Sequence, residues 1–111
     1  METIVMDNGD ISIFVRNAKK TTNDKADDGS NLDRWKQYAK VEFPECSRLD
    51  IKDHKGDIVG AHIVILGEDE NDEFIIPLCS HCNKQPYKEE FPIKDKVYRM
   101  PAKYLHDKVQ T

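Results

Sequence analysis

Two apolar segments joined by an acidic loop decide the fold of this chain. The first is residues 60–65, GAHIVI, and the second is residues 74–84, FIIPLCSHCNK. Nearly continuous apolar residues are typical of strands that are covered on both faces, and His62 is the one polar member of the first segment. The loop between them, residues 67–73 (GEDENDE), is typical of a solvated turn. The stretch therefore predicts two adjacent strands that lead into a Cys-x-x-Cys pair.

The cysteine pattern predicts a metal site. A two-residue spacer lets both sulfurs of Cys79 and Cys82 face one ion, and a zinc ion usually takes four thiolate or imidazole ligands from separate segments. Cys46 is the third ligand expected. The fourth is His62, whose imidazole needs a partner inside an apolar strand, or His54, which lies in a polar connector that can fold back. The sequence thus predicts a zinc site of Cys46, His62, Cys79 and Cys82, with His54 as the alternate ligand.

The length predicts a single domain spanning residues 1–111, and the strands and helix expected in it make it a small α+β domain. The hydrophobic fraction is 38% and the charged fraction 34%, so a bound metal would add useful folding energy. No apolar run is long enough to cross a membrane, and residues 1–4, METI, do not resemble a signal peptide. Three cysteines are an odd number, which argues against a disulfide framework. We therefore expect a soluble, cytoplasmic protein that does not bind membranes.

The N-terminal third divides into a hairpin and a loop. Residues 1–16 predict a β-hairpin, because Asn8-Gly9 suits a type I′ turn between two β-branched segments. Residues 17–30 have no large apolar side chain and predict a mobile loop. Residues 31–111 then form the core that zinc holds together.

An amphipathic helix is expected to follow the loop. Ser30 or Asn31 can cap its first turn, and Leu32, Trp35 and Ala39 repeat at the spacing of one helical face. This pattern turns Trp35 into the core.

The central motif resembles a small group of bacterial zinc-binding proteins. That group has Gly-Ala-His-Val followed by Tyr-Ile-Val-Pro-Leu-Cys-x-x-Cys/His-Asn, and residues 60–63 (GAHI) and 74–83 (FIIPLCSHCN) are similar to it. The group also carries an upstream tryptophan and a Cys-x4-Cys pair. Trp35 and Cys46 fit this pattern, but Ile51 stands where the second cysteine would be. The resemblance implies zinc binding.

More distantly, residues 78–84, LCSHCNK, resemble the treble-clef core of HNH endonucleases. That resemblance implies a treble-clef-like zinc knuckle, with His62 as a general base for phosphodiester cleavage and Asn83 orienting it. Ala61 replaces the residue that precedes the catalytic histidine in that family, and Pro86 cuts short the helix that follows the knuckle. The resemblance therefore implies a fold more than an activity.

Charge is unevenly distributed along the chain. The net charge is −4 overall, but residues 1–82 carry −7 and residues 83–111 carry +3. The basic C-terminal region could contact nucleic acid, whereas the acidic chain as a whole does not attract it. We expect a small zinc-binding structural or interaction module with a protein partner. The alternatives are an HNH-like metal-dependent nuclease and a nucleic-acid-binding protein.

Overall fold

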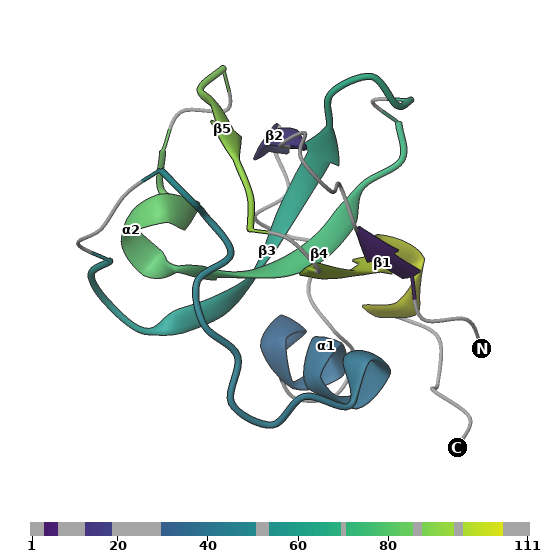
Figure 1. The fold of residues 1–111 in the computed structure, drawn as a ribbon. Helices are drawn as coiled ribbons and strands as arrows, with labels where there is room; N and C mark the ends of the chain where they lie inside the picture. The colour runs from purple at the N-terminus through teal and green to yellow at the C-terminus, as the bar shows by residue number, and fades with distance from the viewer. Residues whose placement is uncertain are drawn as a thin grey trace.

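Six antiparallel strands form one sheet in a computed structural model of the chain, in the order β1-β6-β4-β3-β2-β5 (Figure 1). The structure describes residues 4–6, 13–18, 30–50, 54–69, 71–85, 88–94 and 97–105. The strands are β1 (Ile4–Met6), β2 (Phe14–Asn17), β3 (Ile58–Ile65), β4 (Phe74–Cys79), β5 (Glu90–Pro92) and β6 (Val97–Pro101). The helices are α1 (Asn31–Ala39), α2 (Ser80–Asn83) and the 3-10 helix η1 (Ala102–Leu105). The α+β fold class predicted from the sequence is confirmed.

The central hairpin of β3 and β4 is the longest pairing in the sheet. Its register runs from Ile58 opposite Cys79 to Ile63 opposite Phe74. Every side chain of β4 is buried, as expected for a strand covered on both faces. The two apolar segments predicted as adjacent strands are therefore paired strands, and the hairpin delivers Cys79 to one end of the sheet.

Helix α1 begins with a reciprocal cap. The Asp33 backbone N–H donates to the Ser30 hydroxyl at 3.0 Å, and the Ser30 N–H donates to the Asp33 carboxylate at 3.2 Å. The helix ends at Ala39, and the capping residue Lys40 adopts a left-handed conformation with φ 58°. Trp35 is buried, and its indole N–H donates to the Tyr98 carbonyl in β6 at 2.8 Å. The cap fixes where the helix begins, and the indole bond attaches the helix to the sheet.

The helix approaches the sheet closely at Gly60 in β3. A Cβ atom at this position would lie 2.6 Å from the backbone of both Asn31 and Leu32. Only glycine lets the first turn of α1 rest directly on the strand.

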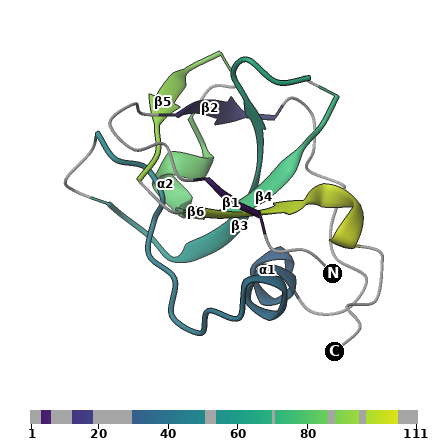
Figure 2. The ribbon, with the colours of Figure 1, turned by 45° about the vertical axis from the view of Figure 1, so that its right-hand side comes forward.

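Two clusters of buried side chains lie on opposite faces of the sheet. One contains α1 residues together with Ile75, Met100 and Leu105. The other contains Ala61, Ile63 and all three cysteines. Because alternate residues of a strand point to opposite faces, the register decides which core each side chain joins. Figure 2 shows α1 on one side of β3 and β4, with β2, β5 and α2 on the other.

The predicted N-terminal hairpin is wrong. Strand β1 pairs with β6, while β2 pairs with β3 and β5, so three strands separate β1 from β2. Placing β2 between two partners gives the backbone N–H and C=O groups on both of its edges hydrogen-bond partners, and it buries Val15 completely. These long-range contacts prevail over the local preference for a turn. The turn itself and residues 19–29 of the predicted mobile loop lie outside the described residues.

Among the described residues, no helix is both long and apolar enough to span a membrane.

Candidate metal centre

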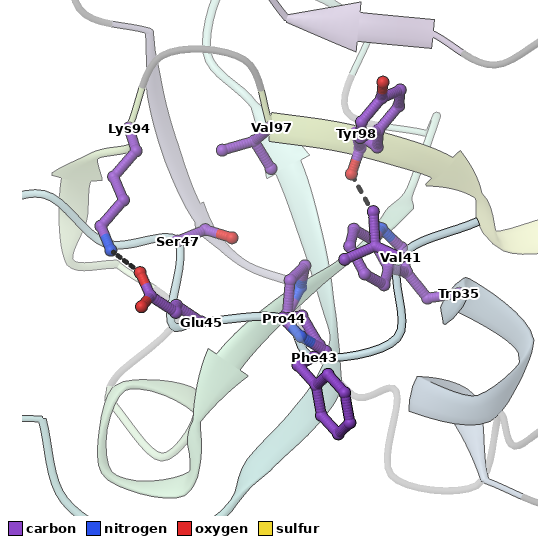
Figure 3. A pocket seen from close by; sticks show the side chains of 10 residues that line it. Trp35, Val41, Phe43, Pro44, Glu45, Ser47, Lys94, Val97 and Tyr98 are labelled. Carbon is purple, nitrogen blue, oxygen red and sulfur yellow. Dashed lines mark hydrogen bonds and ion pairs between the residues drawn. The ribbon is translucent and has the colours of Figure 1, made fainter. Parts of the chain in front are cut away.

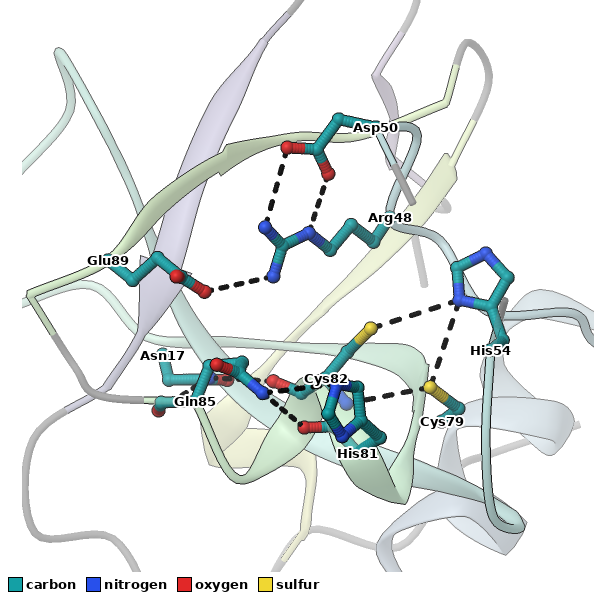
Figure 4. A network of polar contacts seen from close by, with 9 residues as sticks. All are labelled: Asn17, Arg48, Asp50, His54, Cys79, His81, Cys82, Gln85 and Glu89. Carbon is teal, nitrogen blue, oxygen red and sulfur yellow. Dashed lines mark hydrogen bonds and ion pairs between the residues drawn. The ribbon is translucent and has the colours of Figure 1, made fainter. Parts of the chain in front are cut away.

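Four metal-ligating side chains converge at the end of the β3–β4 hairpin. The ligand atoms of Cys46, His54, Cys79 and Cys82 all lie within 4.8 Å of one another. The three cysteines are buried and free, and His54 is half-buried. Figure 4 shows the His54 ring facing the Cys79 and Cys82 sulfurs. These residues could hold a metal ion.

The distances within the cluster suit tetrahedral coordination. His54 Nδ1 lies 3.8 Å from Cys79 Sγ and 3.8 Å from Cys82 Sγ. Zinc bonds of about 2.3 Å to sulfur and about 2.0 Å to nitrogen place a tetrahedral nitrogen and sulfur about 3.5 Å apart. The two observed separations are within about 0.3 Å of this value, so the side chains need little movement to hold an ion between them.

The β4–α2 junction presents the two knuckle cysteines. Cys79 ends β4 and caps the short helix α2, and its sulfur accepts the Cys82 backbone N–H at 3.5 Å. Asn17 in β2 supports the same turn from outside, because its side-chain amide donates to the Cys82 carbonyl at 3.0 Å and to the Gln85 carbonyl at 3.2 Å. The knuckle is therefore held by the sheet as well as by its own helical turn.

The loop that carries His54 lies against the start of α2. The Ser80 N–H donates to the Asp57 carbonyl at 2.8 Å, and the His81 N–H donates to the Lys55 carbonyl at 3.2 Å. Gly56, between these contacts, has φ +87°, and a Cβ there would lie 1.8 Å from the Ser80 hydroxyl oxygen. A glycine is thus needed both for the backbone conformation and for the close approach. These contacts bring His54 to the cysteines.

The connector after α1 supplies the third cysteine. Its Ser47 N–H donates to the Pro77 carbonyl in β4 at 2.9 Å, and the Lys94 N–H donates to the Ser47 carbonyl at 2.8 Å. These two bonds fix the backbone next to Cys46. The cluster thus joins two parts of the connector between α1 and β3 to the more distant β4–α2 junction.

The electrostatics of the cluster favour one thiolate when no ion is present. Burial works against the Cys79 thiolate, but hydrogen bonds from the Cys82 backbone and thiol and from His54 outweigh it and lower the pKa of Cys79 to about 6. Burial, together with neighbouring Cys79 and Cys46, raises the pKa of Cys82 to about 12. A bound divalent cation would stabilise the thiolate forms of both cysteines, because its positive charge balances theirs.

His62 lies outside this cluster. It pairs with Ile75 on the face that α1 covers, and its register is four residues from the Ile58–Cys79 pair. Four residues of strand span about 13 Å. Its Nδ1 lies 3.3 Å from a Glu73 carboxylate oxygen, and its Nε2 lies 3.5 Å from the Asn31 side-chain nitrogen. The imidazole predicted as the fourth ligand therefore has polar neighbours of its own, and the alternate ligand, His54, takes its place in the cluster.

Several other predicted site residues lie in ordinary surroundings. Asn83 is exposed at the end of α2. Of the basic C-terminal side chains, Lys94 lies 3.6 Å from Glu45 and Arg99 lies 2.7 Å from Glu68. Both ion pairs offset part of the positive charge in this region.

Two supporting residues were not singled out by the sequence. Gly56 lies in the polar connector that carries His54, and no local signal in the sequence indicates its close approach to α2. Asn17 is the first residue of the predicted loop, residues 17–30, and nothing next to it in the sequence indicates its contact with the knuckle.

No family model, curated protein or solved structure gives a significant match to this chain. The cluster's own chemistry must therefore carry the functional argument.

Proposed function

We propose that Cys46, His54, Cys79 and Cys82 bind one zinc ion whose role is structural. The observation that carries this proposal is the convergence of three sulfurs and one imidazole nitrogen within 4.8 Å. Sulfur and imidazole ligands suit zinc, whereas calcium and magnesium prefer oxygen. Four protein ligands complete a tetrahedral shell, and a closed shell is typical of structural rather than catalytic zinc.

The ion would stabilise the fold by linking three separate segments of the chain. Cys46 comes from the connector after α1, His54 from the loop before β3, and the other two ligands from the β4–α2 junction. Binding energy at such a site is folding energy, because the unfolded chain does not hold the ligands together. The chain with its ion is then a small interaction module, with a surface formed by the rest of the sheet and α1.

The resemblances to bacterial zinc-binding proteins and to the treble-clef knuckle support zinc as the metal. They do not support an HNH nuclease mechanism. The residue that would act as general base, His62, is buried on the α1 face beside Glu73, about 13 Å along the strand from the knuckle. We therefore favour a structural module over a nuclease or a nucleic-acid-binding protein.

Two histidine variants test the ligand set. Metal content is measured by elemental analysis after purification without added metal, and fold is measured by circular dichroism. The natural chain is expected to hold one zinc per chain, His54→Ala to lose most of it, and His62→Ala to retain it. Cobalt substituted for zinc should give the visible absorption of tetrahedral thiolate coordination in the natural chain and in His62→Ala.

The outcomes separate the alternatives cleanly. Loss of zinc in His62→Ala with retention in His54→Ala would reverse the ligand assignment. A natural chain that contains no metal, and that keeps its fold in a strong chelator, would refute the structural zinc.

A further inference from the structure

An apolar groove lies beside the metal centre, between α1, β6 and the connector after α1. Its walls include Trp35, Val41, Val97 and Tyr98, and its volume is about 310 Å³. Phe43 stands at the rim with 84% of its surface exposed, and its ring projects away from Val97 (Figure 3). A large exposed ring beside an apolar hollow is typical of an interaction surface.

The polar rim of this groove carries one charge of each sign. Lys94 lies 3.6 Å from Glu45, and the side chain of Glu45 is 87% exposed. An exposed ion pair of this kind adds less than about 1 kcal/mol to stability, so its members can change partners at little cost. A patch with both signs can face a copy of itself across a two-fold axis, each acid meeting the other copy's base.

A second groove on the molecule lacks this property. It is lined by Ile13, Phe14, Ile65 and Leu66, and its charged lining residues are Glu68 and Glu90. Among the described lining residues none is basic, although Arg99 pairs with Glu68 from outside the groove. Two copies meeting through this groove would bring like charges together. Of these two grooves, the one beside Phe43 therefore has the charge pattern that suits self-association.

We infer that two copies of this chain associate through the groove beside Phe43. The Phe43 ring of each copy enters the groove of the other, and Glu45 of each copy pairs with Lys94 of the other across a two-fold axis. The groove volume of about 310 Å³ leaves room for one aromatic ring. The inference goes beyond the proposed zinc site: Glu45 directly precedes the ligand Cys46, but Phe43, Glu45 and Lys94 are not among the four ligands.

The first test measures mass against concentration for the zinc-loaded chain. Light scattering or sedimentation should show a mass that rises from 12.9 kDa toward twice that value. Phe43→Ser removes the central anchor and should raise the dissociation constant about 30-fold or more. Phe14→Ser and Leu49→Ser are matched controls, because these side chains are 44% and 51% exposed but do not line the groove. Both controls should leave the dissociation constant unchanged.

The second test uses charge reversal. Glu45→Lys and Lys94→Glu should each weaken the dimer, because each places like charges across the axis. An equimolar mixture of the two variants should restore association, since both cross-axis pairs then combine opposite charges. A charge pair that acted only within one chain would give no such recovery on mixing.

The outcomes distinguish this inference from the proposed zinc site. A chain that holds one zinc but stays monomeric at every concentration overturns the dimer and leaves the metal site standing. A chain without metal overturns the zinc proposal, whatever its mass. Equal dissociation by Phe43→Ser and Phe14→Ser, or no recovery on mixing the charge variants, overturns this interface.

Discussion

Replacing Gly56 by alanine is expected to weaken zinc binding without unfolding the chain. The residue has φ +87°, a conformation that costs a residue with a Cβ roughly 1–2 kcal/mol. The new Cβ would also lie 1.8 Å from the Ser80 hydroxyl oxygen, so that oxygen or the loop must move by more than about 1 Å. Either movement disturbs the contacts that hold His54 beside the cysteines.

The expected loss is worked from these two effects. Strain and clash together should cost about 1–3 kcal/mol in the metal-bound state, while the metal-free loop can relax away from α2. Because 1.4 kcal/mol is a factor of ten, zinc affinity should fall about 10- to 100-fold. The assay is a competition titration against a coloured zinc chelator of known affinity, with circular dichroism to confirm the fold.

Two further variants isolate the cause. Gly67→Ala is a matched control, because Gly67 has φ +90° but, apart from its two chain neighbours, no described residue has an atom within 4 Å of the added Cβ. It should lower stability and leave zinc affinity unchanged. Adding Ser80→Ala to Gly56→Ala removes the closest atom and leaves the Ser80 Cβ at 3.1 Å, so part of the affinity should return. Natural zinc affinity in Gly56→Ala would refute the idea that contact with α2 positions His54.

Three other changes probe the surroundings of the site. Gly60→Ala places a Cβ 2.6 Å from the backbone of α1 and should cost about 1–3 kcal/mol in urea denaturation, with zinc content unchanged; an unchanged unfolding midpoint would contradict the close packing. Asn17→Ala leaves the Cys82 carbonyl without its 3.0 Å donor and should cost about 1–3 kcal/mol and raise the rate of zinc loss to a chelator. The rate of zinc loss to a chelator should be higher in Asn17→Ala than in Gly60→Ala. Arg48 lowers the pKa of Asp50, so this carboxylate should add stability above about pH 4 and lose it as pH falls through the lowered pKa. Since Asp50 is 42% exposed, Asp50→Asn should cost less than about 1 kcal/mol at pH 7 and progressively less as the pH falls below about 4, as measured by urea denaturation across that range.

Local sequence determined β3, β4, the start of α1 and three of the four candidate ligands. Continuous apolar residues specify β3 and β4, and Ser30 with Asp33 specifies the start of α1, because each signal acts within a few residues of chain. The spacing of Cys79 and Cys82 likewise needs only one helical turn to bring two sulfurs together. Such features could be predicted because their physical causes are short-range.

Pairings between distant segments depended on the tertiary structure. The Asn8-Gly9 turn signal predicted a hairpin, yet β2 gains two neighbours and a buried Val15 by pairing with β3 and β5 instead. The local preference for a turn is small compared with the burial that these long-range pairings provide.

The tertiary structure also decided which histidine is the fourth candidate ligand. Both His54 and His62 lay within reach of the cysteines along the chain. His62 lies four residues, about 13 Å, along β3 from the Ile58–Cys79 pair and contacts Asn31 of α1, while the close contact of Gly56 with α2 brings His54 to the sulfurs. The local sequence determined the strands, the helix start and the cysteine pair of the candidate site. Register and loop packing, which arise only when distant segments meet, decided which histidine joins it.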